Sequence, residues 1–195
     1  MISIHRELDK LLGGGLLPGK ITHIYGPPNS GKTNLALLAT KSAANQGKVI
    51  YIDSEGGFSI ERLKQICTEE EFKRVSKNLM LIEPADYEEQ KVAINKLSEI
   101  VPRADTKLIR VDSISVLYRL EEEKDSKELG RQMAKLLRIA RKYKIPVFIT
   151  NQVYTDINTQ ETVPVGGDIL MYWAKIILSL EKKGEERICL LYTSD

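Results

Sequence analysis

The amino-acid sequence predicts an α/β fold with a mostly parallel central sheet flanked by helices and an antiparallel edge hairpin at the C-terminal end. Short β-rich runs alternate with helix-forming segments along most of the chain, an order that produces parallel strands covered on both faces. A glycine-rich loop joins one such run directly to a helix, and a K-K-G-E-E turn separates two late apolar runs. At 195 residues the chain is most simply one domain, 1–195.

The N-terminal half alternates turn signals with apolar runs. Leu8, Leu11 and Leu12 suggest a first amphipathic turn or two, and the glycines at 13–15 mark the loop after it. The run at 21–25 is rich in β-formers and predicts a strand, and N-L-A-L-L-A predicts a helix that begins near Lys32. We further expect a buried strand at 48–53, a short helix at 60–67, a polar connector at 68–78 and a small strand at 79–82.

The C-terminal half continues this alternation. Apolar residues recur at helical spacing over 87–100, and this predicted helix ends before Pro102. A strand at 107–112 follows. The clearest helix is 127–143, whose buried face should consist of Leu129, Met133, Leu136 and Ala140. Strands are expected at 146–150, 176–180 and 187–192, and the last two should form the edge hairpin around K-K-G-E-E.

Composition and charge exclude several classes of protein. The 29 basic and 27 acidic residues leave a formal net charge of +2, so bulk electrostatics do not require a nucleic-acid partner. Cys67 and Cys189 lie far apart, which argues against a disulfide framework or a zinc site and fits a reducing compartment. No signal-peptide pattern is present, and no apolar run approaches the roughly 20 residues that span a bilayer. We therefore expect a cytoplasmic location without a membrane partner.

The most specific motif is G-P-P-N-S-G-K-T, which fits the phosphate-binding pattern G-x-x-x-x-G-K-[ST]. Backbone N–H groups of such a loop surround a polyphosphate, because glycine lets the chain approach the anion closely. The lysine adds positive charge, the next helix directs its N-terminus at the phosphates, and the threonine hydroxyl is a ligand for Mg²⁺. The alternative, a glycine-proline turn that carries Lys-Thr by chance, conflicts with the strand and helix around it. The predicted nucleotide-binding residues here are Gly26, Pro27, Pro28, Asn29, Ser30, Gly31, Lys32 and Thr33.

Further strand ends carry polar groups at the edge where parallel sheets bind ligands. Glu55 follows the 48–53 strand, where its carboxylate can orient or deprotonate an attacking water or merely cap the next helix. Asp112 ends the 107–112 strand, a position that suits an acid holding Mg²⁺ through water. Gln152 follows the 146–150 strand, where an amide can sense a terminal phosphate or simply cap the strand.

Arg110 is unexpected in the 107–112 strand, because a central strand covered on both faces is normally apolar. Two explanations are open. Either Arg110 pairs with a buried acid, or this strand has one face open to solvent or to a partner.

The chain resembles the ATPase core of the RecA/RadA strand-exchange recombinases. The resemblance covers nearly the whole chain, from Leu8 to about Cys189, and its segments occur in family order. They are L-D-K-L-L-G-G-G-L-L-P-G-K-I-T-H-I-Y-G-P-P-N-S-G-K-T, Y-I-D-S-E-G-G-F-S-I-E-R-L, L-I-R-V-D-S-I-S, E-L-G-R-Q-M, I-T-N-Q-V and G-G-D-I-L. The resemblance implies a RecA-like P-loop ATPase core that binds ATP with Mg²⁺.

For single residues, the resemblance implies that Glu55 activates the attacking water and that Asp112 holds the metal through water. It implies that Gln152 is a catalytic residue that couples nucleotide to the second DNA-binding loop. Arg62 matches an arginine that lies against adenine, where a planar guanidinium stacks well. Segments 119–130 and 153–167 take the places of the two DNA-binding loops.

The chain also departs from the family pattern. It begins at the core, without the helical N-terminal domain and the Phe-x-x-Ala linker of full recombinases, so we do not expect ordinary filament assembly. Its second DNA loop is shorter, and Tyr172 stands where those recombinases carry a histidine at the subunit interface, so ATP and DNA should be weakly coupled. Its end at Ser194-Asp195 suggests that a C-terminal strand or two is missing.

Two groups of basic residues are candidates for DNA contact. On the 127–143 helix, steps of four and three residues place Lys127, Arg131, Lys135, Arg138 and Lys142 in one stripe. Such a stripe binds phosphates with strong salt dependence, or it is only a solvated helix face. A second patch, with the same alternative, consists of Lys182, Lys183 and Arg187.

These observations lead us to expect an ATP- and DNA-binding accessory protein of recombination and DNA repair, with weak ATPase activity. Its partners would be single- or double-stranded DNA, with little sequence preference, and the main archaeal recombinase or another repair protein, and it could form a homodimer. The alternatives are a filament-forming strand-exchange recombinase, a nucleotide-sensing adaptor without hydrolysis, and a RecA-like ATPase outside recombination, such as a clock or motility protein.

Overall fold

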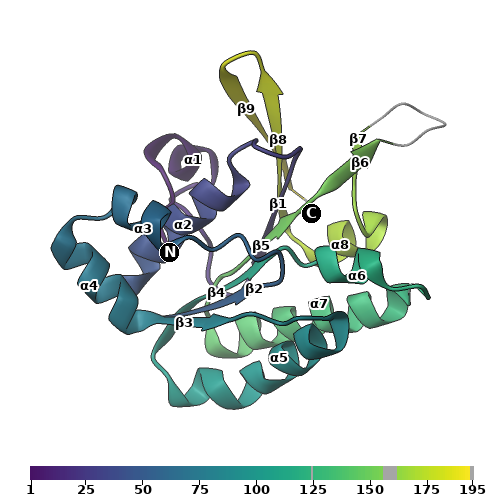
Figure 1. Cartoon of the computed structure of the whole chain (residues 1–195), viewed down its shortest axis with the longest axis horizontal. Helices are drawn as coiled ribbons and strands as arrows, with labels where there is room; N and C mark the ends of the chain where they lie inside the picture. The colour runs from purple at the N-terminus through teal and green to yellow at the C-terminus, as the bar shows by residue number, and fades with distance from the viewer. Residues whose placement is uncertain (124, 156–161, 194–195) are drawn as a thin grey trace.

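The computed structural model describes residues 1–123, 125–155 and 162–193, which fold around a seven-stranded sheet (Figure 1). The strand order is β3-β2-β4-β5-β1-β8-β9, and neighbouring strands in it are parallel except for the antiparallel pair β8 and β9. The predicted fold class is therefore confirmed. The strands of this sheet are β1 (Ile21–Tyr25), β2 (Lys48–Asp53), β3 (Leu79–Ile82), β4 (Thr106–Asp112), β5 (Val147–Asn151), β8 (Ile176–Lys183) and β9 (Glu186–Thr193).

Helices cover both faces of the sheet, as Figure 1 shows. One face packs against α1 (Arg6–Leu11), α2 (Lys32–Ala44), α3 (Ile60–Ile66) and α4 (Glu69–Asn78). The other packs against α5 (Tyr87–Ile100), η1 (Val101–Arg103), α6 (Val116–Leu120), α7 (Ser126–Tyr143) and α8 (Gly167–Trp173). The two hydrophobic clusters beneath these layers meet the buried central strands from opposite sides, which explains why those strands are almost continuously apolar.

The later elements confirm the patterns that predict them. Leu129, Met133, Leu136 and Ala140 are completely buried along α7, as the helical spacing requires. The hairpin is longer than predicted, since β8 and β9 stay paired up to Lys183 and Glu186 beside the turn. A second, separate antiparallel ribbon, β6 (Val153–Thr155) with β7 (Thr162–Pro164), lies where the resemblance places the second DNA loop.

The polar connector expected at 68–78 is wrong, because this segment is helix α4. Its start is a capping box: the Thr68 hydroxyl accepts from the backbone N–H of Glu71, and the Glu71 carboxylate accepts from the backbone N–H of Thr68. Only Val75 is fully buried on α4, so its apolar periodicity is too weak to reveal the helix. In the first helix, α1 and its C-terminal end, Leu8 and Leu12 face the core, whereas the Leu11 residue is 42% exposed.

Candidate nucleotide-binding site

The strand order brings four of the polar strand ends to one edge of the sheet. Strands β2, β4, β5 and β1 are consecutive neighbours, and all run in the same direction. Asp112 is the last residue of β4, and Glu55, Gln152 and the loop after β1 lie within two residues of the carboxyl ends of their strands. The prediction that these groups lie together is therefore matched by the topology.

The phosphate-binding loop joins β1 to α2 in a conformation that a bound anion would suit. Gly31 has φ 102° and Asn29 has φ 60°, so the chain turns through the left-handed region twice before the helix begins. No side chain of the described residues caps the N-terminus of α2, which leaves its first N–H groups free for a ligand. A Cβ on Gly26 would stand only 2.5 Å from the carbonyl oxygen of Leu180, so β8 lies directly against this loop.

Lys32 is held inside the loop. Its ammonium group donates to the carbonyl oxygens of Gly26 at 2.8 Å and Pro27 at 2.9 Å. Burial lowers the pKa of Lys32 below its ordinary value, and the nearby carboxylates of Glu55 and Asp112 oppose part of that shift. The charge therefore sits at the loop, next to the free N–H groups of the helix.

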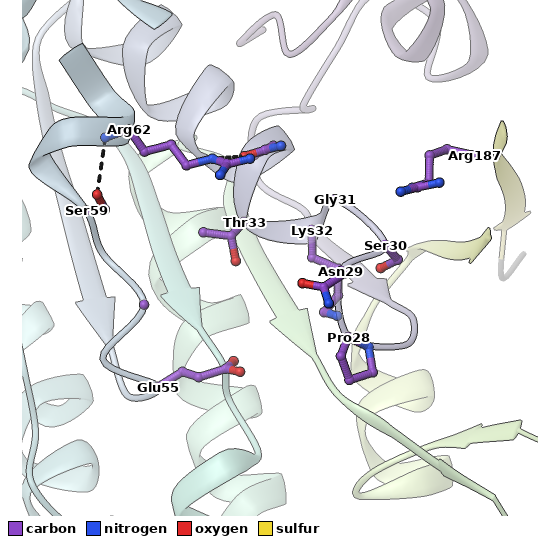
Figure 2. A pocket seen from close by; sticks show the side chains of 12 residues that line it. Pro28, Asn29, Ser30, Gly31, Lys32, Thr33, Glu55, Ser59, Arg62 and Arg187 are labelled. Atoms are coloured by element: carbon purple, nitrogen blue, oxygen red, sulfur yellow. Dashed lines mark hydrogen bonds between the residues drawn. The ribbon is translucent and has the colours of Figure 1, made fainter. Parts of the chain in front are cut away.

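A cavity of about 740 Å³ opens over this loop, a size typical of small-molecule sites. Figure 2 shows the loop between Arg62 and Arg187, with Glu55 reaching in from the turn after β2. Inside the loop, the hydroxyl of Ser30 is buried without a hydrogen-bond partner among the described residues. The cavity is lined by Pro28, Asn29, Ser30, Gly31, Lys32, Thr33, Asn34, Glu55, Gly57, Ser59, Arg62 and Arg187.

Glu55 is positioned by the turn that follows β2. The Asp53 carboxylate accepts from the backbone N–H groups of Glu55 at 3.3 Å, Gly57 at 3.2 Å and Phe58 at 2.8 Å, which closes this turn. The alternative that Glu55 caps the next helix is wrong, because the Ser59 side chain caps α3. The exposed Glu55 carboxylate is left to point toward the cavity (Figure 2).

A chain of hydrogen bonds ties Glu55 to the first residue after β5. The amide nitrogen of Gln152 donates to Glu55 Oε1 at 2.8 Å, and Arg119 donates to the amide oxygen of Gln152 at 3.0 Å. Because a guanidinium can only donate, Arg119 turns the amide oxygen toward itself and the amide N–H toward Glu55. Arg119 lies on α6 at the start of the first expected DNA loop, and sequence reasoning assigned it no role of its own.

Asp112 is the buried acid that pairs with Arg110. The completely buried Arg110 forms an ion pair with Asp112 and stacks on the Tyr51 ring, 3.8 Å from its centroid. The first explanation, a buried acid, is therefore confirmed. Asp112 also accepts from the Tyr51 hydroxyl at 3.0 Å and from the Thr150 hydroxyl. These partners occupy most of its acceptor sites, and the buried Asp112 is not among the residues that line the cavity. Its role as a magnesium acid therefore remains a prediction.

The residues of the site could bind Mg²⁺ together with a phosphate, but they do not form a complete metal site by themselves. The Thr33 hydroxyl lines the cavity, and a hydroxyl with a carboxylate that acts through water is a usual partial ligand set for Mg²⁺ beside phosphate oxygens. Within the described residues, no group of three or more His, Cys, Asp or Glu side chains could hold an ion without a phosphate.

Arg62 is fixed beside the cavity by two contacts. Its backbone N–H donates to the Ser59 hydroxyl at 3.2 Å, and its guanidinium Nε donates to the amide oxygen of Asn34 at 2.7 Å. The first contact caps α3, and the second holds the planar cation over the start of α2, at the wall of the cavity. The adenine-stacking role remains a prediction.

Sequence reasoning missed a buried polar network behind the site. Ser54 donates to Gln90 at 2.7 Å, and Gln90 donates to Gln132 at 2.9 Å and to the Ile114 carbonyl at 3.1 Å. This network ties the turn that carries Glu55 to α5 and α7. No local pattern predicts it, because its members come from segments distant in the sequence.

The basic stripe of α7 lies on the outer surface of that helix, beside α5. Arg131 forms an ion pair with Glu128 at 3.1 Å, Lys135 donates to Asn95 at 2.6 Å, and Lys142 lies over the Tyr143 ring. Lys127, Arg138 and Lys142 are exposed. DNA binding by this stripe and a solvated helix face both remain open.

The three residues of the second basic patch lie on two different faces of the hairpin. Lys182 stands opposite Arg187 across the two strands, and Lys183 stands opposite Glu186. Because side chains alternate along a strand, Lys182 and Arg187 share the face of Leu180 and Cys189, and Lys183 points to the other face. A single patch of Lys182, Lys183 and Arg187 is therefore not formed.

A membrane-spanning role has no support from the helices that the structure describes, since none of them is both long and apolar enough to cross a bilayer.

Known proteins resemble this chain in both sequence and fold. A family model described as Rad51 matches residues 2–195. A DNA repair and recombination protein RadB of Methanosphaera stadtmanae is 44% identical over 189 residues, which cover 93% of this chain and 81% of the relative. A RadB of Thermococcus kodakarensis is 44% identical over 91% of this chain and 81% of its own length. A solved structure titled RadB recombinase is 40% identical, with a TM-score of 0.85, over 100% of this chain and 90% of that one.

Proposed function

Because this chain belongs to the Rad51 family and to its RadB branch, we propose that it is an ATP- and DNA-binding accessory protein of homologous recombination and DNA repair, with weak ATPase activity. The observation that carries the proposal is the convergence of a complete phosphate-binding loop with the Glu55 carboxylate on one cavity. A loop with free helix N–H groups and a lysine binds polyphosphate, and a carboxylate across from it can act on water.

The principal polar groups of the site have separate tasks in this proposal. The N–H groups at the start of α2 and the Lys32 ammonium bind the phosphates, and Arg62 stacks on the base. Thr33 and Asp112 would hold Mg²⁺, which supplies charge neutralisation at the phosphate oxygens when it is bound. Glu55 orients a water and accepts its proton, and the amide of Gln152 keeps one carboxylate oxygen of Glu55 occupied so that the other faces the water.

Slow hydrolysis follows from how open this site is within one chain. Glu55 is exposed, and the cavity is bounded by the loop, the α3 region and the hairpin without a covering element among the described residues. Electrostatic stabilisation of a transition state weakens when bulk water reaches the reacting groups. A second protein on this surface would supply the missing cover, which fits an accessory role beside a recombinase.

The DNA part of the proposal is supported by the family and by two surfaces. The ribbon β6–β7 and helix α6 lie at the carboxyl edge of the sheet, and the basic stripe is carried by α7, the next helix along the chain. Contacts of this kind bind phosphates without reading bases, so we expect little sequence preference.

Calorimetry with ATP and Mg²⁺ tests the nucleotide part directly. Wild-type protein should bind ATP, Lys32→Ala should bind it at least ten-fold more weakly, and Glu55→Gln should bind it within a few-fold but lose turnover. DNA binding, followed by fluorescence anisotropy at two salt concentrations, should weaken steeply with salt and respond little to nucleotide.

Other outcomes select the rival functions. Turnover equal in wild type and Glu55→Gln would indicate a nucleotide-sensing adaptor. ATP-dependent filaments on single-stranded DNA, lost in Lys32→Ala, would indicate a strand-exchange recombinase. Nucleotide binding without any salt-sensitive DNA binding would place the protein outside recombination.

A further inference from the structure

Arg187 lies on the β8–β9 hairpin, far in sequence from the phosphate-binding loop, yet it lines the same cavity. It shares this cavity with Ser30, Gly31 and Lys32. In Figure 2 its side chain extends from the hairpin toward the loop, on the side opposite Arg62. Because its side chain comes from β9, the placement depends on how the hairpin packs against the loop.

The hairpin packs closely against the loop. The carbonyl oxygen and Cβ of Leu180, on β8, stand 2.5 and 3.0 Å from the position that a Cβ on Gly26 would take. Leu180 is buried, and Cys189, its partner across the hairpin, packs against the same core cluster. Arg187 is two residues from Cys189 on the same face, so its side chain starts from the face of the hairpin that packs toward the loop.

The guanidinium of Arg187 has no acidic partner among the described residues. Its hydrogen bonds there go to the main-chain carbonyls of Glu185 at 3.3 Å and Glu186 at 3.2 Å, at the long end of the hydrogen-bond range. Arg62, by comparison, is tied to Asn34 at 2.7 Å. Arg187 therefore keeps most of its donors available for another acceptor.

The hairpin also places like charges opposite each other on the face of the loop. Lys182 stands directly across from Arg187, an arrangement that destabilises a strand pair, whereas Lys183 stands across from the oppositely charged Glu186 on the other face. An anion bound near Arg187 would relieve this repulsion. The charge pattern of the hairpin thus points to a negative ligand on the side of the cavity.

We propose that Arg187 is a nucleotide-binding residue that contacts the polyphosphate from the β9 side of the cavity. This inference rests on the proposed nucleotide-binding function and assigns Arg187 to it, in place of the DNA patch expected from the sequence.

Calorimetry with two probes, ATP and inorganic tripolyphosphate, tests the inference at fixed Mg²⁺. Arg187→Ala should weaken both by about ten-fold, the usual size of a lost charged hydrogen bond, and Arg187→Lys should lie between Arg187→Ala and wild type. Lys183→Ala is the matched control, because it removes one positive charge from the same turn but on the opposite face, and it should stay within two-fold of wild type. Equal thermal midpoints without ligand would show that the variants are folded.

Several results would overturn the inference. These are an unchanged affinity in Arg187→Ala, an equal loss in Lys183→Ala, or a loss for ATP with tripolyphosphate binding retained, which would assign Arg187 to the base. If wild-type protein binds neither probe, the proposed function fails together with the inference. If wild type binds ATP and Lys32→Ala does not, while Arg187→Ala matches wild type, only the inference fails.

Discussion

The buried pair of Arg110 and Asp112 should make the stability of the whole domain depend on one ion pair. Arg110 is completely buried in β4, Asp112 is 2% exposed, and the Arg110 guanidinium stacks on Tyr51. Replacing Arg110 by methionine keeps much of the apolar stem but removes the charge. The carboxylate of Asp112 is then left in the core without its counter-ion.

The expected cost follows from these contacts. Removing one partner of a buried ion pair costs about 3–5 kcal/mol. Asp112 keeps hydrogen bonds from the hydroxyls of Tyr51 and Thr150, which stabilise the remaining charge, so Arg110→Met should lie near the lower end, at about 3 kcal/mol. A domain of this size is stable by about 5–15 kcal/mol, so the variant should still fold.

Urea unfolding of wild type, Arg110→Met, Asp112→Asn and the double variant measures this cost. The double variant should be more stable than the sum of the single losses predicts, by about 2 kcal/mol, because it leaves no unpaired charge. Arg103→Met, an exposed arginine of η1, is the control and should change the free energy of unfolding by less than about 0.5 kcal/mol. A loss below about 1 kcal/mol for Arg110→Met, or additive single losses, would refute the reasoning.

Three further predictions concern other parts of the molecule. Burial lowers the pKa of His23 to about 3, below its ordinary 6.5, so the unfolded chain binds a proton that the folded chain does not. The free energy of unfolding should therefore fall as the pH drops below about 6.5, by up to ~1.4 kcal/mol per pH unit. His23→Leu should flatten this slope in urea titrations between pH 7 and 4, and an unchanged slope would contradict the assignment. Thr68→Ala should lower the free energy of unfolding by about 1 kcal/mol through loss of the α4 cap, whereas Ser76→Ala, exposed on the same helix, should be neutral. Arg119→Ala and Gln152→Ala should each lower ATP turnover several-fold with little change in ATP affinity, because both belong to the hydrogen-bonded chain that ends at Glu55. The double variant should turn over ATP no more slowly than either single variant, and additive losses would show that the two residues act independently.

Much of the fold follows from local patterns. The helix α5 and the strands β1, β2 and β3 have the bounds that their apolar patterns predict. Helix α5 buries a stripe of residues at helical spacing, and β1 and β2 are short apolar runs buried on both faces. Helix α4 escapes the same reasoning, since one buried valine leaves almost no periodic signal. Its capping box, T-E-E-E, is the sequence signal that could have revealed it.

The site divides in the same way. The phosphate-binding loop is local, because its glycines, lysine and threonine act from one continuous segment, and a single sequence pattern contains all of its chemistry. The partners of Glu55 and Asp112 are not local. Gln152 reaches Glu55 from a strand that is separated from β2 in the sheet by β4.

The sequence by itself determined the strands of the large sheet and the helices α2, α5 and α7, the segment that fits a phosphate-binding loop, and which strand ends carry acids and amides. Only the tertiary structure decided that Arg110 neutralises Asp112 and that Arg119 orients Gln152. It also decided that Arg187, and not Lys183, is the hairpin residue that faces the phosphate-binding loop. The physical reason is that strand order and hairpin register arise from pairing between distant segments, and a change of one residue in register moves a side chain to the other face of the sheet.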